Sequence, residues 1–220
     1  MYSHLMMKPI SLSDGNTKLV KTSGEVYKVV GFGIPADLTF NGINTCRGAG
    51  ACRSVCYAKA GAYLFPNVVT AKRANLDATL ADTFAADMVA AIRRRRSYNT
   101  VRIHDAGDFY SKEYFAKWCA VARALPGHKF YAYTKALDLD LWTDKPDNFQ
   151  VVQSLGGVFD RLVDLNRSHS RIFASEAARV AAGYVDGNVN DIPAIEGVTR
   201  IGLVYHGTRK LTLPQVRYFG

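Results

Sequence analysis

Short apolar segments typical of β-strands alternate along this chain with segments that have helical periodicity. Apolar side chains recur every four positions within 67–97, and Ser111 can cap a second helix that ends before Pro126-Gly127. The strand-like segments are 100–103, 129–133, 149–153, 171–174 and 201–205. Such alternation indicates βαβ units and a parallel sheet. Because five or six strands are too few for a complete eight-stranded barrel, we predict an α/β fold with a partial (βα) barrel of mainly parallel strands; an open doubly wound sheet is the alternative.

The segments between these elements are less regular. Residues 17–35 indicate a strand or hairpin, because Lys18-Leu19-Val20 and a second apolar run flank the turn signal Ser23-Gly24-Glu25. The other expectations are a long loop at 36–66, a short helix or turn at 135–143, a helix at 157–165 and a loop at 183–198. A loop as long as 36–66 inside a domain is usually functional.

Composition indicates a folded protein. The chain has 220 residues, of which 48% are hydrophobic and 21% charged, so it can bury a core, and we expect a single α/β domain over 1–220. It contains no apolar run of the ~20 residues that cross a bilayer, and Met1–Lys8 lacks the core of a signal peptide. The expectation is a cytoplasmic protein with no membrane partner.

The chain is basic, with 28 Lys and Arg against 19 Asp and Glu and a net charge of +9. This excess favours anionic partners such as nucleic acid, nucleotides or carboxylate ligands. The densest run, Arg93–Arg96, closes a helical pattern, where cations also complement the helix C-terminus. Nucleic-acid contact and a solvated helix end are both compatible with this run.

Three of the four cysteines lie within eleven residues. Cys46, Cys52 and Cys56 occupy a glycine-rich loop at 42–63, with the spacing C-x5-C-x3-C, and Arg47 and Arg53 lie close enough in sequence to balance thiolate charge. Structural zinc usually takes four ligands, whereas an iron–sulfur cluster can have three local cysteines and a different fourth ligand. An iron–sulfur cluster is therefore the first interpretation, zinc the second and unmetallated thiols the third. Cys119 lies on the apolar stripe of a helix and is expected in the core.

Polar residues follow most of the predicted strands. In parallel α/β folds the carboxyl ends of the strands form the ligand-binding edge, although loops are polar in any case. The residues at these ends are His104 and Asp105, Thr134 and Lys135, Gln153 and Ser154, Ser175 and Glu176, and His206. We therefore predict that a metal held by the cysteines lies at this edge and faces His104-Asp105 and Tyr133-Thr134-Lys135.

Three stretches, Cys46–Tyr63, Arg102–Phe109 and Phe130–Lys135, together resemble the bacteriophage gene-product-88 family. The resemblance covers about residues 40–140 and implies a phage protein in the cytoplasm of the infected host cell. Its order of parts is also similar to that of radical S-adenosylmethionine enzymes, in which three cysteines follow the first strand and a glycine–acid motif follows the next. Those enzymes have the spacing C-x3-C-x2-C, which differs from the spacing in this chain.

The resemblance implies a 4Fe-4S cluster on Cys46, Cys52 and Cys56, with one open iron that binds S-adenosylmethionine. It implies that Gly107 and Asp108 bind the ligand's ammonium group, because an acid complements a cation. The further cofactor-side or substrate-side candidates are Lys135 for the carboxylate, with His104, Asp105, Glu176 and His206. The alternative for Asp108 is an acid that stabilises the N-terminus of the helix at 111–124.

In a non-enzymatic alternative, the metal only stabilises the loop, and the basic surface binds nucleic acid. Tyrosines near Arg and Lys would then stack on bases: Tyr57, Tyr63, Tyr98, Tyr110 and Tyr114. The sequence does not name a substrate, and the choice between redox or radical chemistry and this alternative stays open.

Overall fold

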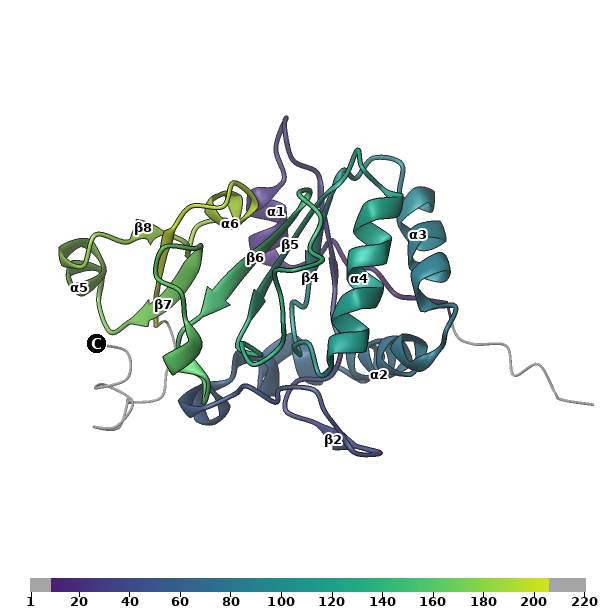
Figure 1. Ribbon diagram of the computed structural model, residues 1–220, viewed down its shortest axis with the longest axis horizontal. Coiled ribbons are helices and arrows are strands. Elements are labelled where there is room, and N and C mark those ends of the chain that lie inside the picture. The colour runs from purple at the N-terminus through teal and green to yellow at the C-terminus, as the bar shows by residue number, and fades with distance from the viewer. Residues whose placement is uncertain (1–8, 206–220) are drawn as a thin grey trace, which may run out of the picture.

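A curled parallel sheet forms the centre of the molecule (Figure 1). The computed structural model describes residues 9–205. In spatial order the strands are β1 (Val29–Phe32), β4 (Thr100–Ile103), β5 (Lys129–Thr134), β6 (Phe149–Ser154), β7 (His169–Phe173), β9 (Arg200–Val204) and β8 (Val185–Asp186). All neighbouring strands in this order are parallel. The predicted partial barrel is confirmed, and the described sheet has seven strands rather than five or six because a short edge strand, β8, adds to it.

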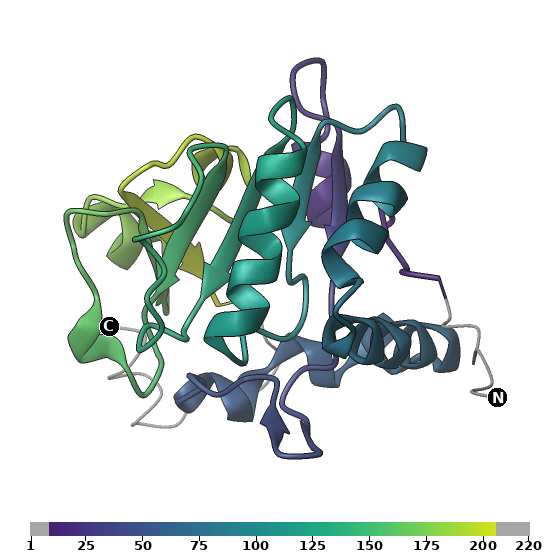
Figure 2. The same cartoon turned by 45° about the vertical axis from the view of Figure 1, so that its right-hand side comes forward.

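The helices α3 (Phe84–Arg94) and α4 (Lys112–Ala124) cover the outer, convex face of the sheet, and α2 (Pro66–Leu80) lies below them at the carboxyl ends of the strands (Figure 2). Their apolar sides and the outward side chains of the strands form the larger core, whose most buried bulky residues include Trp118, Phe32 and Phe84. The Ser111 hydroxyl accepts a hydrogen bond from the backbone N–H of Tyr114, so the predicted cap of α4 is confirmed.

The helical pattern at 67–97 is two helices, not one. The chain leaves the helical path between Leu80 and Phe84, and Leu80 is 44% exposed although it fits the apolar stripe. The break changes the chain direction, so that α3 runs beside α4 while α2 crosses below them (Figure 2). As predicted, the arginine run closes the second helix, with Arg93 and Arg94 in its last turn.

The concave face of the sheet is filled only near the amino ends of its strands. There α1 (Thr17–Thr22) and α6 (Ile192–Ile195) pack on the sheet and form a second apolar cluster with the strands. The predicted strand at 18–20 is wrong: the Asn16 side chain accepts a hydrogen bond from the backbone N–H of Lys18 and starts a helix that buries Leu19. The carboxyl half of the concave face remains open.

The long segment after β1 lies across the carboxyl ends of the strands, at the bottom of Figure 1. It contains no α-helix and consists of short pieces: β2 (Thr39–Phe40), β3 (Ile43–Asn44), and the 3-10 turns η1 (Ala51–Val55), η2 (Tyr57–Lys59) and η3 (Gly61–Leu64). An antiparallel bridge between Ala49 and Gly157 ties it to the loop after β6. The predicted functional loop is therefore docked on the edge of the sheet.

The C-terminal half departs from the sequence pattern in three places. The predicted helix at 157–165 is only a 3-10 turn, η4 (Asp160–Leu162). A short helix, α5 (Glu176–Ala181), begins after Ser175, whose side chain caps it. The predicted loop at 183–198 contains β8 and α6. Within residues 9–205, no helix is long and apolar enough to cross a bilayer.

Candidate functional site

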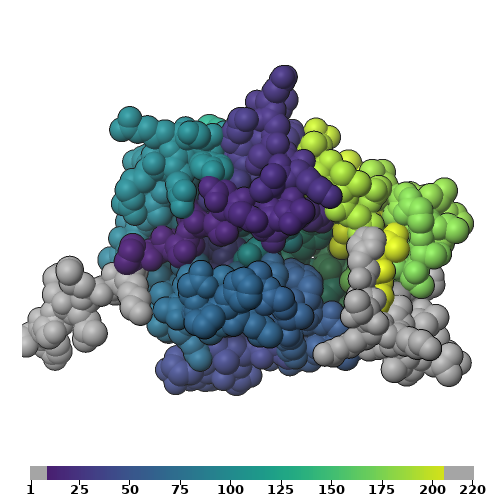
Figure 3. All heavy atoms as spheres, turned by 180° about the vertical axis from the view of Figure 1, so that it is seen from behind, coloured from purple at the N-terminus to yellow at the C-terminus, as the bar shows by residue number. Residues whose placement is uncertain are grey.

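A pocket of about 460 Å³ opens at the carboxyl edge of the sheet. Seen from behind, the surface is hollowed between the N-terminal segment, the cysteine loop and the last strand (Figure 3). Lining residues come from α1, the loop at 42–63, the ends of β4, β5 and β6, and the inner faces of β7 and β9. The pocket is therefore the unfilled carboxyl half of the partial barrel.

All three loop cysteines line this pocket, and none forms a disulfide. The Cys46 sulfur accepts a hydrogen bond from the backbone N–H of Asp37 at 3.2 Å. This placement at the carboxyl edge agrees with the sequence-based prediction for the thiols. Within the described part of the chain, however, no group of three or more His, Cys, Asp or Glu side chains is arranged to hold a metal ion. A metal on these thiols remains a prediction.

The three loop cysteines are half-buried, and the arginines beside them in the sequence leave their charge uncompensated. Burial raises the pKa of Cys46 to about 12, helped by nearby Asp108, Cys56 and Cys52. Burial also raises the pKa of Cys52, although the Lys135 ammonium group opposes it. Arg47 and Arg53 do not supply the expected charge, because they pair with Asp138 and Asp37. The thiols of Cys46 and Cys52 thus stay protonated until a cation reaches them, so metal binding by these two residues would release protons.

Asp108 lies on the pocket wall and is not the cap of α4. Its Oδ1 accepts hydrogen bonds from the Thr134 hydroxyl at 2.6 Å and the Phe109 N–H at 2.7 Å, and its Oδ2 accepts one from the Lys135 N–H at 2.9 Å. Burial raises its pKa, against the effect of these donors. Gly107, which also lines the pocket, has φ +80 and so adopts a conformation that favours glycine. The carboxylate is therefore held in place at the pocket surface, and a cation bound beside it would stabilise its charged form.

Lys135 lines the pocket, but its ammonium group is already used. It donates to the Ser154 carbonyl at 3.2 Å, the Ser154 hydroxyl at 2.6 Å and the Leu155 carbonyl at 2.6 Å. An ammonium group has three donors, so none is left for a ligand's carboxylate. Lys135 instead joins β5 to the end of β6 and places a positive charge near Cys52 and Cys46.

His104 is buried beside the pocket in an uncommon backbone conformation. Its φ is +65, its Nε2 lies 2.9 Å from the Tyr114 hydroxyl, and its Nδ1 is buried without a hydrogen-bond partner in the described structure. Burial, with a contribution from Lys72, lowers the pKa of His104 to about 3. The ring is therefore neutral near pH 7.

Asp105 does not line the pocket, contrary to the prediction that it faces the metal. Its carboxylate binds the Lys72 ammonium of α2 at 2.6 Å. Its carbonyl accepts hydrogen bonds from the hydroxyls of Tyr57 at 2.6 Å and Tyr63 at 3.5 Å, both on the cysteine loop. Asp105 therefore anchors the loop and α2 to the end of β4.

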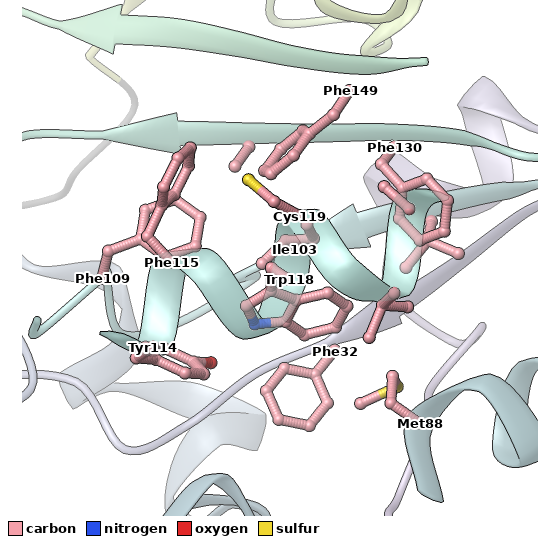
Figure 4. Close-up of a cluster of buried hydrophobic side chains, with 14 of the residues drawn as sticks. Phe32, Met88, Ile103, Phe109, Tyr114, Phe115, Trp118, Cys119, Phe130 and Phe149 are labelled. Carbon is pink, nitrogen blue, oxygen red and sulfur yellow. The ribbon is translucent and has the colours of Figure 1, made fainter. Parts of the chain in front are cut away.

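Two other predicted residues are not brought to the pocket. Glu176 begins α5, where its largely exposed carboxylate pairs with Arg179. His206 lies outside the described residues. Cys119 is 1% exposed and packs among aromatic side chains of the larger core, as expected (Figure 4).

The tyrosines considered for base stacking are partly used inside the fold. Tyr114 is buried in the core, and the Tyr110 ring stacks on it at 4.4 Å between centroids. The hydroxyls of Tyr57 and Tyr63 are committed to Asp105, although the Tyr57 ring is largely exposed. These contacts explain several of the tyrosines without nucleic acid.

Sequence reasoning missed a charged network on the inner face of the barrel. The fully buried Asp191 pairs with Arg102 of β4 and Lys18 of α1, and both of these cations line the pocket. Burial alone would raise the pKa of Asp191, but the two cations lower it. Arg102 within an otherwise apolar strand was the available signal, because a charge on a buried strand needs a partner.

The loop docks so closely that Gly48 tolerates no side chain. A Cβ at this position would lie 2.0 Å from the Lys135 carbonyl oxygen. We expect Gly48→Ala to lower the free energy of unfolding by about 1–3 kcal/mol, because the loop must move away from β5. The measurement is urea unfolding, with Gly24→Ala as control, since no atom lies within 4 Å of a Cβ there. Equal stability of the two variants would contradict this docking.

Fold and site together define a half-barrel α/β protein with a thiol-lined pocket at the carboxyl edge of its sheet. The sequence model of the family described as "Gene product 88" matches residues 10–211, and the chain belongs to this family. It is 34% identical over 94 residues to the "Gene 88 protein" of Mycobacterium phage L5, which is 38% of this chain and 39% of that protein. The match thus spans about two fifths of the length of this relative. No solved structure matches the chain.

Proposed function

We propose that this member of a phage family is an iron–sulfur protein with a radical-S-adenosylmethionine-like partial barrel, acting in redox or radical chemistry on a small molecule. The observation that carries the proposal is that three free thiols from one loop line the same pocket as a buried carboxylate. A four-iron cluster supplies, when bound, one-electron chemistry and an iron with a free coordination position.

Three thiols from one loop suit a cluster, because each cysteine binds a different iron and the fourth iron can take a ligand from outside the protein. A structural zinc ion usually takes four protein ligands. The Asp37 N–H on the Cys46 sulfur and the nearby Lys135 ammonium are the kinds of outer contact that stabilise thiolate ligands.

Asp108 supports the choice of S-adenosylmethionine as the second cofactor. Its carboxylate is buried and lines the pocket, and its hydrogen-bond donors among residues 9–205 are neutral N–H and O–H groups. An ammonium group beside it would supply the missing charge. The ligand's carboxylate would need a partner other than Lys135, whose donors are occupied. The Nδ1 of His104 is a further unpaired polar atom at the pocket wall.

Adenosylmethionine binding to cluster-loaded protein tests this proposal. Calorimetry should detect binding, and the spectrum of the reduced cluster should change on addition of the ligand. Asp108→Asn should weaken binding by about tenfold or more, since a hydrogen-bonded charge partner is lost while the shape is kept. Asp140→Asn is the control, because Asp140 lies on an exposed loop. No binding to loaded protein, or equal affinity of both variants, would contradict the role of adenosylmethionine.

A further inference from the structure

Two cations line the pocket on the inner face of the barrel. The Arg102 Nη1 lies 2.9 Å from Asp191 Oδ2, and the Lys18 ammonium lies 2.7 Å from Asp191 Oδ1. Arg102 and Lys18 contribute to the pocket lining, whereas the carboxylate between them is fully buried behind the pocket surface. The pocket therefore presents the positive side of this group to a ligand.

One carboxylate does not neutralise both cations. Asp191 also accepts hydrogen bonds from the hydroxyls of Tyr131 at 3.0 Å and Tyr133 at 3.3 Å, so four donors share its two oxygens. Burial raises the pKa of both tyrosines, which are therefore neutral, and with both cations charged the group carries a net charge of about +1. Burial lowers the pKa of Lys18, against the effect of Asp191 and the nearby Asp186. A net charge in a buried site is costly unless a counter-charge joins it.

Arg102 has donors that the described fold does not use. Its side chain is 10% exposed, and its Nε is buried with no hydrogen-bond partner among residues 9–205. A guanidinium has five N–H donors in a planar fork that fits a carboxylate or phosphate with two parallel bonds. A purely structural pair with Asp191 would use that fork, but Arg102 contacts the carboxylate through one nitrogen only.

We propose that Arg102 and Lys18 bind the oxyanion of the pocket's ligand, which is a small molecule with a carboxylate or phosphate group. The pocket walls beyond the cations include Ile172 and Leu203, which suit an apolar body attached to that group. This assignment names the substrate class of the same pocket and so rests on the proposed function. It uses residues on the barrel wall and not the cysteine loop, which allows the two to be tested separately.

Titration with inorganic phosphate and with acetate tests the assignment. The probe is the 15N-coupled Nε–H resonance of Arg102 in full-length protein, assigned by its absence from Arg102→Gln. We expect this resonance to shift and saturate with one of the two anions, and the anion that binds more tightly distinguishes phosphate from carboxylate. Arg102→Gln should weaken binding by about tenfold or more, measured by calorimetry. Arg179→Gln, which removes an arginine from α5 away from the pocket, should leave binding unchanged.

The direction in which one substitution changes the anion affinity distinguishes a ligand site from a structural ion pair. Asp191→Asn removes the carboxylate that contacts both cations and should tighten anion binding by about tenfold, because both cations lose this counter-charge. If this variant does not fold, Lys18→Met keeps the Arg102–Asp191 pair and should weaken binding severalfold. An Arg102 resonance that does not respond to either anion, or affinities unchanged in all these variants, would overturn the assignment.

Failure here differs from failure of the proposed function. If the variants change anion binding as expected but the protein never takes up iron, the oxyanion site is supported and the cluster is refuted. If the protein takes up iron but binds neither anion, the cluster is supported and the oxyanion site is refuted.

Discussion

Replacing Cys46, Cys52 or Cys56 by alanine is expected to abolish stable iron binding in each case, while Cys119→Ala keeps it. Each of the three loop thiols lines the pocket, and a cluster held by only three protein ligands cannot lose one of them without losing an iron. Cys119 is 1% exposed within the aromatic core, where it behaves as a small apolar residue. Iron and sulfide analysis of anaerobically reconstituted variants, compared with wild type, is the measurement.

Circular dichroism of each variant provides the control, because loss of fold would also lose iron. Full iron content in any of the three loop variants would show that the thiol at that position is not a ligand. Loss of iron in a folded Cys119→Ala protein would contradict the assignment of Cys119 to the core.

His104 is expected to make the protein sensitive to acid. Its pKa is about 3 in the native state, because the ring is buried, against an ordinary value of 6.5. Between these values the unfolded chain binds more protons than the native one, so stability falls as the pH is lowered through this window. We expect a loss of about 2–3 kcal/mol between pH 7.5 and pH 4.5 from this residue alone.

Urea unfolding of wild type and His104→Asn at several pH values checks this expectation. Asparagine tolerates the left-handed conformation at this position better than most residues and has no titrating ring. Wild type should lose more stability than His104→Asn on acidification. His128→Asn should change the pH profile less than His104→Asn, because burial also lowers the pKa of His128 but its side chain is only half-buried. Parallel pH profiles for wild type and His104→Asn would mean that the pKa of the ring is the same in the native and unfolded states.

The central strands could be predicted because their signal is local. Thr100–Ile103 and Phe149–Gln153 are apolar runs bounded by polar residues, and the structure places both as parallel strands. The placement of the cysteines and Asp108 at one pocket could also be predicted, because parallel strands bring their carboxyl ends together. Cys119 was placed correctly by the spacing of its neighbours on one helix face.

The predictions that were wrong or incomplete concern contacts between residues far apart in the sequence. Leu19 and Thr22 are the buried residues of α1, whereas Val20 is exposed, and two adjacent apolar residues in six do not distinguish a helix from a strand. Arg102 on a buried strand indicates that a partner is needed, but Asp191 lies 89 positions away, so no local pattern identifies it. Ser175 ends a strand as predicted, but it also caps a helix that carries Glu176 away from the pocket. Lys135 lies in the pocket as predicted, yet its donors are taken by the end of β6.

Iron and acid-labile sulfide content of the anaerobically purified protein tests the central claim most directly. We predict about four irons and about four sulfides per chain, with the broad absorption near ~400 nm of a brown protein, all removed in the loop cysteine variants. A colourless protein that takes up no iron or sulfide on anaerobic reconstitution, or that instead binds one zinc per chain, would contradict it.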